Sequence, residues 1–193
     1  MSGNLKEKDK SFLKENDNIN IKQGNALDLS GYQNALFDAV LVFGPMYHLY
    51  SKEDKIRVLN EAKRVVKDNG YIFVAYCMNE ATIIQWGFNG NGDNITRAIK
   101  ENMLEEDFKC ISAPKDIFEL VRIEDIEELN KECGLERIKF VGTDTFAHYI
   151  KDRIDSWTDE VYKMYLEYHL AICERPDIIG VSNHTMDILR KKQ

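Results

Sequence analysis

The sequence predicts an α/β fold, a Rossmann-like and mostly parallel sheet flanked by helices. Residues 37–43, apart from Asp38, and residues 71–76 are runs of apolar side chains rich in β-branched and aromatic types, a pattern typical of strands buried on both faces of a parallel sheet. Between them, residues 51–66 repeat apolar side chains at helical spacing. A strand, a helix and a strand with short connections form a βαβ unit, whose two strands run parallel.

The elements around this unit follow from local signals. Residues 4–16 are rich in helix formers but poor in apolar side chains, so we expect a surface helix. Residues 18–22 alternate apolar and polar side chains, which predicts a short strand. The strand at 37–43 ends at Gly44, which a proline follows. Ser51 is expected to cap the next helix and Gly70 to end it in a left-handed conformation.

The second half of the chain predicts an insertion and three further elements. Residues 79–117 contain two helical stretches around a glycine-rich loop, and we interpret them as a lid within one domain, 1–193. The remaining expected elements are an acidic helix at 123–133 capped by Gly134, a buried strand at 135–141, an amphipathic helix at 157–173 and a last strand at 182–190.

Composition limits the class of protein. The chain has 193 residues, of which 44% are hydrophobic, and a formal net charge of -7, so we expect a folded domain whose partners are small molecules rather than nucleic acids or membranes. The longest apolar stretch, 37–46, is about ten residues, against the ~20 that span a bilayer. Four cysteines without a C-x-x-C pair predict reduced thiols in a cytoplasmic protein.

Residues 18–78 resemble class I S-adenosylmethionine-dependent methyltransferases of the small-molecule type. The stretches that carry the resemblance are I-K-Q-G-N-A-L-D-L at 21–29, F-D-A-V-L-V-F-G-P-M-Y-H-L at 37–49, I-R-V-L-N-E-A-K-R-V-V-K at 56–67 and D-N-G-Y-I-F-V-A at 68–75. The resemblance implies S-adenosyl-L-methionine as cofactor and S-adenosylhomocysteine as product. The cofactor-binding residues that it implies are Asn25, Ala26, Leu27, Phe43, Gly44, Pro45 and His48.

Two expected motifs of this family do not precede Asn18: the glycine-rich loop after the first strand and the acidic residue that ends the second. We therefore expect an N-terminally truncated methyltransferase fold, with a gap of roughly 14 Å (three spacings of ~4.8 Å) in the sheet. The third strand could pair directly with the fourth, a second copy could fill the gap in a homo-oligomer, or a missing N-terminal segment could fill it.

Several candidate residues have a structural alternative. Asn25 could contact adenine or cap a turn, and His48 could act as a base, touch the cofactor or bond near a helix start. Gly44 allows close backbone approach or only ends a strand. Phe43 or Tyr47 could present an aromatic face to the sulfonium.

The glycine-rich loop at 87–92 follows no buried strand, so we expect a flexible loop rather than a phosphate site, and the flanking Trp86 and Phe88 could line a substrate pocket or pack the lid. His148 and His169, with Asp144 and Asp152, lack tight ligand spacing, so we expect no metal.

The predicted function is methyl transfer to a small molecule, with no catalytic residue assigned. The sequence Gly44-Pro45-Met46-Tyr47 replaces the Asn/Asp-Pro-Pro-aromatic motif of many amino-group methylators, which favours an O-, C- or other acceptor. The alternative is a non-catalytic remnant or partner subunit that uses the same scaffold to associate. A nicotinamide-dependent enzyme is disfavoured, because no G-x-G-x-x-G follows a strand.

Overall fold

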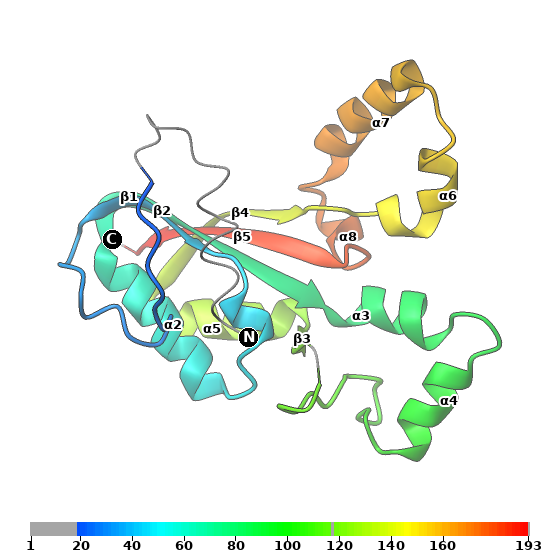
Figure 1. Cartoon of the computed structure of the whole chain (residues 1–193), viewed down its shortest axis with the longest axis horizontal. Helices are drawn as coiled ribbons and strands as arrows, with labels where there is room; N and C mark the ends of the chain where they lie inside the picture. The colour runs from blue at the N-terminus through cyan, green and yellow to red at the C-terminus, as the bar shows by residue number, and fades with distance from the viewer. Residues whose placement is uncertain (1–18, 117, 193) are drawn as a thin grey trace.

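The computed structural model describes residues 19–116 and 118–192. They form a mixed sheet of five strands with helices on both sides (Figure 1). The helix expected at 4–16 lies outside the described residues. None of the helices in the described part has the length and apolar character needed to span a bilayer.

The strand order is β1-β2-β5-β4. β1 (Phe37–Val42) and β2 (Val66–Met78) are parallel, as the βαβ pattern predicts. β5 (His184–Lys191) runs antiparallel to both β2 and β4 (Leu135–Gly142). The short β3 (Leu120–Val121) pairs with the end of β2. This arrangement confirms the Rossmann-like α/β class.

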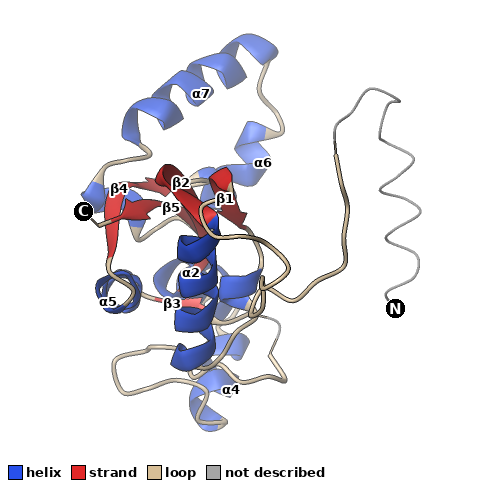
Figure 2. Ribbon diagram, turned by 90° about the vertical axis from the view of Figure 1, so that its left-hand side faces the viewer, coloured by secondary structure: helices blue, strands red, loops and turns tan. Residues whose placement is uncertain are grey.

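Two helices cover one face of the sheet and form the core with it. α2 (Lys52–Val65) follows β1, and α5 (Ile123–Glu132) precedes β4; both lie on the same side of the sheet (Figure 2). The Ser51 hydroxyl accepts the backbone N–H of Asp54 and caps α2, as expected. Gly134 follows α5 with φ +60°, also as expected. Buried side chains of the two helices and the sheet form the core, which includes Val42, Val58, Leu59, Ile72, Val74, Tyr76, Met78, Ile126, Leu129 and Leu189.

Gly70 does not end α2, contrary to expectation. The helix stops at Val65, Val66 is already extended, and Gly70 lies inside β2. Position 70 requires glycine because the neighbouring strand is close: a Cβ here would lie 2.6 Å from the carbonyl oxygen of Asp38 on β1. Gly70 therefore lets β2 approach β1 closely rather than turning the chain.

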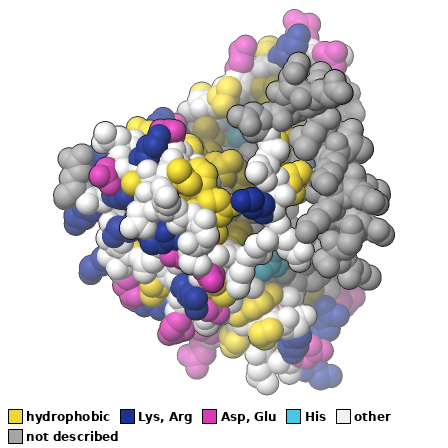
Figure 3. Space-filling model, turned by 60° about the vertical axis from the view of Figure 1, so that its left-hand side comes forward, with side chains coloured by type: hydrophobic (Ala, Val, Ile, Leu, Met, Phe, Trp, Pro, Cys, Tyr) yellow, Lys and Arg dark blue, Asp and Glu magenta, His cyan; other side chains and the backbone are white. Residues whose placement is uncertain are grey.

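Two strand predictions are wrong in part. Residues 19–22 form no strand, and Ile19 and Ile21 are exposed. β1 is not buried on both faces, since Ala39 and Leu41 are exposed, Leu41 to 61%. In the described part of the chain β1 has one neighbouring strand, so it is an edge strand there. Hydrophobic side chains gather in the middle of the face shown in Figure 3.

Two segments extend from the sheet. Residues 79–117 contain α3 (Asn79–Thr82), a π-helical turn η2 (Ile83–Gly87) and α4 (Asp93–Lys100). Between β4 and β5, residues 143–183 contain η3 (Ala147–Ile150), α6 (Lys151–Ile154), α7 (Asp159–Ile172) and α8 (Pro176–Ile179).

α7 confirms the amphipathic helix expected at 157–173, but none of its residues is buried and Leu170 is 72% exposed. The helix stands away from the sheet on the side opposite α2 (Figure 2).

Candidate active site

The carboxyl end of β1 turns sharply at Gly44. This residue has φ +124°, a conformation that favours glycine, and Pro45 then opens the single turn η1 (Pro45–Tyr47). Met46 is 1% exposed and anchors η1 in the core. Phe43 is 53% exposed at the strand end. The turn thus presents an aromatic side chain and a bare backbone at the edge of the sheet where open α/β folds bind ligands.

An aromatic cluster joins this turn to the segment before β3. The rings of Tyr47 and His48 lie 5.0 Å apart, and Phe118 lies 5.7 Å from Tyr47 and 5.6 Å from His48 (centroid distances). The backbone N–H of Glu119 donates to the carbonyl of Tyr47 at 2.9 Å. The His48 backbone N–H donates to Pro45 at 3.0 Å, while its side chain is exposed. This backbone bond closes the C-terminal end of η1, so it does not test the expected alternative of a histidine hydrogen-bonded near a helix start.

Phe118 lines an apolar cavity of about 130 Å³, whose other walls come from residues between Thr82 and Asp116 and from Leu120 of β3. Its apolar lining includes Ile83, Trp86, Ala98, Met103, Leu104 and Ile111. Thr82, Ser112 and Asp116 supply polar atoms. Trp86 lines this cavity, in line with the expectation that it could line a pocket. The Arg97 guanidinium lies 5.5 Å from the centroid of the Trp86 ring. Phe88 does not contribute to the lining and is 57% exposed.

Polar contacts fix the segment that encloses the cavity. The fully buried Asn79 accepts the backbone N–H of Cys110 at 2.8 Å and donates to the carbonyl of Phe108 at 3.2 Å. Arg122 donates to Glu80 at 2.6 Å and also pairs with Asp107. Burial raises the pKa of the Cys110 thiol to about 11. The thiol is therefore protonated at neutral pH and is a poor nucleophile.

Asn25 caps a turn, which is the structural alternative weighed from the sequence. Its Oδ1 accepts the backbone N–H of Leu27 at 3.0 Å. Ala26 and Leu27 pack against the edge of the core. The backbone N–H of Leu29 donates to Glu61 on α2 at 2.7 Å, so the loop is attached to that helix.

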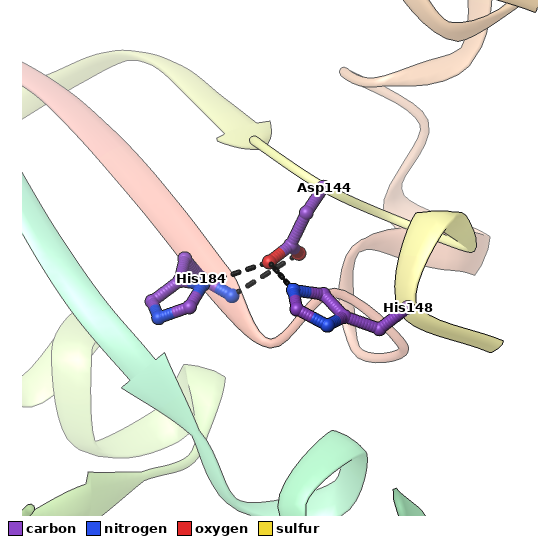
Figure 4. Close-up of side chains that lie close together, drawn as sticks. All are labelled: Asp144, His148 and His184. Atoms are coloured by element: carbon purple, nitrogen blue, oxygen red, sulfur yellow. Dashed lines mark hydrogen bonds and ion pairs between the residues drawn. The ribbon is translucent and has the colours of Figure 1, made fainter. Parts of the chain in front are cut away.

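A polar cluster at the start of β5 was not recognised in the sequence. Asp144 Oδ2 lies 2.7 Å from His184 Nδ1 and 3.4 Å from His148 Nε2 (Figure 4). Asp144 and His148, for which the sequence shows no tight ligand spacing, therefore lie close together in the structure. In the sequence only Asp144 and His148 are close, as an i,i+4 pair. The pairing of β4 with β5 places His184 beside them.

The charges in this cluster support one another. The hydrogen bond with Asp144, followed by the contribution of Cys77, raises the pKa of His184 to about 10. Burial opposes ionisation of Asp144, but hydrogen bonds from His184 and Ser182 lower its pKa overall. At neutral pH the two residues form an ion pair, so His184 is not a free base in this arrangement.

Comparisons with known proteins agree on one fold. Residues 1–74 match the methyltransferase-domain family, and no curated protein matches the sequence. A SAM-dependent methyltransferase from Methanosarcina mazei is 14% identical with a TM-score of 0.50, covering 89% of this chain and 66% of that one. The PH0226 protein of Pyrococcus horikoshii OT3 is 13% identical with a TM-score of 0.52, covering 97% and 65%.

This chain thus spans about two thirds of the length of either structure. The match of residues 1–74 and the shared fold together confirm the resemblance that the sequence motifs indicate, which is to the class I S-adenosylmethionine-dependent methyltransferases.

Proposed function

We propose that this chain takes part in the transfer of a methyl group from S-adenosyl-L-methionine to a small molecule. One observation carries the proposal: the exposed turn at Phe43 and Gly44 connects, through the rings of Tyr47 and Phe118, to an apolar cavity. A cofactor beside the turn and an acceptor in the cavity would meet at the aromatic cluster. The family match favours this enzyme over a non-catalytic subunit on the same scaffold.

The cofactor would lie over the carboxyl end of β1. Phe43, Gly44, Pro45 and His48 surround this position, and Gly44 offers backbone without a side chain. S-adenosylmethionine, when bound, supplies a methyl group that its sulfonium has already activated. The aromatic faces of Phe43 and Tyr47 suit a cation, because the ring quadrupole attracts positive charge.

The adenine would lie beside Asn25, Ala26 and Leu27. Because the turn occupies Oδ1 of Asn25, we assign any adenine contact to the Nδ2 amide of Asn25 and to the backbone of the two following residues. The Asn25 turn then positions these groups instead of competing with them.

The acceptor would place an apolar group in the cavity. Its volume of about 130 Å³ is close to the ~150 Å³ that accommodates a benzene ring in an engineered protein cavity. Ser112 and Thr82 would orient a polar substituent at its wall. The residues described need do little more than align the two reactants and exclude water, and we assign no general base.

Titration calorimetry with S-adenosyl-L-methionine tests the proposal. We expect binding that Phe43→Ala weakens by about tenfold, since an aromatic face beside the cationic sulfonium contributes ~1–2 kcal/mol. Phe88→Ala is the matched control, because Phe88 is equally exposed and lies outside the cavity.

The titration is repeated on a protein that also carries any coding sequence found upstream of Met1. Absence of binding in both proteins, or equal effects of the two substitutions, would refute the assignment.

A further inference from the structure

A second candidate site lies between β4 and β5, outside the proposed cofactor and acceptor positions. Asp144, His148 and His184 each offer one ligand atom, and these three atoms lie within 4.8 Å of one another. Both imidazoles approach the same oxygen, Oδ2 of Asp144 (Figure 4). Two imidazole nitrogens and a carboxylate oxygen around one point are a ligand set that transition metals use in proteins.

Buried groups hold the carboxylate in this orientation. Ser182, which is fully buried, donates its hydroxyl to Oδ1 of Asp144 at 2.5 Å. The backbone N–H of His184 donates to the same Oδ1 at 3.2 Å. These bonds occupy Oδ1 and leave Oδ2 directed at the two imidazoles. Hydrogen bonds of this kind orient metal-ligating carboxylates in known sites.

The backbone beside Asp144 is strained. Thr145 has φ +35°, a conformation that β-branched residues rarely adopt, and it is 1% exposed. Its backbone N–H donates to Ser182 Oγ at 2.9 Å, and the N–H of Asp144 donates to the same oxygen at 3.2 Å. Strain of this kind persists only where surrounding contacts impose it, and it concentrates at functional sites.

The cluster is also accessible. The side chains of His148 and His184 are 48% and 52% exposed, whereas that of Asp144 is 16% exposed. His184 pairs with Cys77 near the carboxyl end of β2, so the cluster lies at the ligand-binding edge of the sheet. An ion held there would keep a coordination position open to solvent, as in zinc sites with three protein ligands.

We propose that Asp144, His148 and His184 bind a divalent transition-metal ion, with Zn²⁺ as the best-fitting ion. Zinc takes Zn–N distances of about 2.0–2.1 Å and Zn–O distances of about 2.0–2.2 Å, and the three ligand atoms lie within 4.8 Å of one another. The ion replaces the proton shared by His184 and Asp144, and that proton goes to solvent. The open position would accept water or an oxygen atom of a ligand.

Calorimetric titration of the chelator-treated, tag-free protein with Zn²⁺ tests this proposal, and cobalt substitution gives a second readout. We expect one equivalent of Zn²⁺ per chain and visible Co²⁺ absorption bands. His184→Ala should weaken binding by at least 100-fold, and Ser182→Ala by about 10–100-fold. The control replaces His48, a histidine outside the cluster, and should bind as the parent does.

Three results would overturn the proposal: no stoichiometric binding by the parent, undiminished binding by His184→Ala, or equal loss in the control. His148→Ala serves as a second variant, because its exposed side chain can be removed with little effect on folding. The assay involves no methyl transfer, so its outcome is independent of the proposed function.

Discussion

The buried pair of Arg137 and Asp187 allows a quantitative prediction about stability. Asp187 lies on β5 and is fully buried. Arg137 donates to both carboxylate oxygens, at 2.8 and 3.0 Å, and Asn130 donates to Oδ2 at 2.7 Å. Replacing Arg137 by methionine removes the cation but keeps an apolar stem over the ring of Phe140, which now lies 4.3 Å from the guanidinium.

The expected cost of Arg137→Met is large because it leaves a carboxylate buried without its cation. Breaking a buried pair by removing one partner typically costs about 3–5 kcal/mol. At a urea dependence of about 2 kcal/mol per molar, the unfolding midpoint should fall by about 1.5–2.5 M. Arg190→Met is the matched control: Arg190 pairs with Glu136 at 2.9 Å with both side chains over 40% exposed, and such pairs contribute about 0–1 kcal/mol.

The pH dependence gives an independent check. Burial raises the pKa of Asp187, against the opposing effect of Arg137. A raised carboxyl pKa means that the native state binds more protons than the unfolded state between the ordinary and the raised value, so stability falls as pH rises through that window. Removing Arg137 raises this pKa further, so the deficit of Arg137→Met should be largest at neutral pH and shrink on acidification.

A double variant tests the cause. Adding Asp187→Leu to Arg137→Met removes the uncompensated charge and should restore most of the lost stability, because replacing both members of a buried pair by apolar groups is often neutral. The reasoning is refuted if Arg137→Met costs no more than Arg190→Met, or if its deficit grows as the pH is lowered.

Three further predictions concern the fold and the cavity. Gly70→Ala should lower the free energy of unfolding by about 1–3 kcal/mol, because its Cβ would overlap the carbonyl of Asp38; thermal unfolding measures this. Ser51→Ala removes the cap of α2 and should cost about 1 kcal/mol in urea unfolding. Asn79→Ala removes the acceptor of the Cys110 amide, should cost about 1–3 kcal/mol and should speed hydrogen exchange at that amide.

Matched substitutions make these results interpretable. Gly31→Ala introduces a methyl group that, chain neighbours aside, has no atom of the described residues within 4 Å, so it should change stability far less than Gly70→Ala. Ser30→Ala, at an exposed loop position, controls for the loss of a hydroxyl outside a helix cap. Asn91→Ala, in the exposed loop before α4, should leave exchange at Cys110 unchanged. Equal effects within any of these pairs would contradict the corresponding explanation.

The candidate site was only partly predictable from the sequence. The turn at Gly44 was recognised because a glycine and a proline that follow an apolar run have local consequences for the backbone. Only Trp86 of the cavity was predictable, since the other lining residues are spread over positions 82–120. The cluster around Asp144 was missed, because His184 is brought to it by a strand pairing that spans 40 residues.

What the sequence determined by itself is the set of local elements: β1, α2, β2, α5, β4 and β5, each indicated by apolar spacing, a cap or a glycine. Tertiary structure alone decided which of their faces are buried. The pattern of β1 predicts burial on both faces, yet Leu41 is exposed. Residues 19–22 alternate like a strand, yet they pair with no strand of the part that the structure describes. The reason is physical: a backbone conformation depends on neighbouring residues in the chain, whereas strand pairing and burial depend on segments that only folding brings alongside.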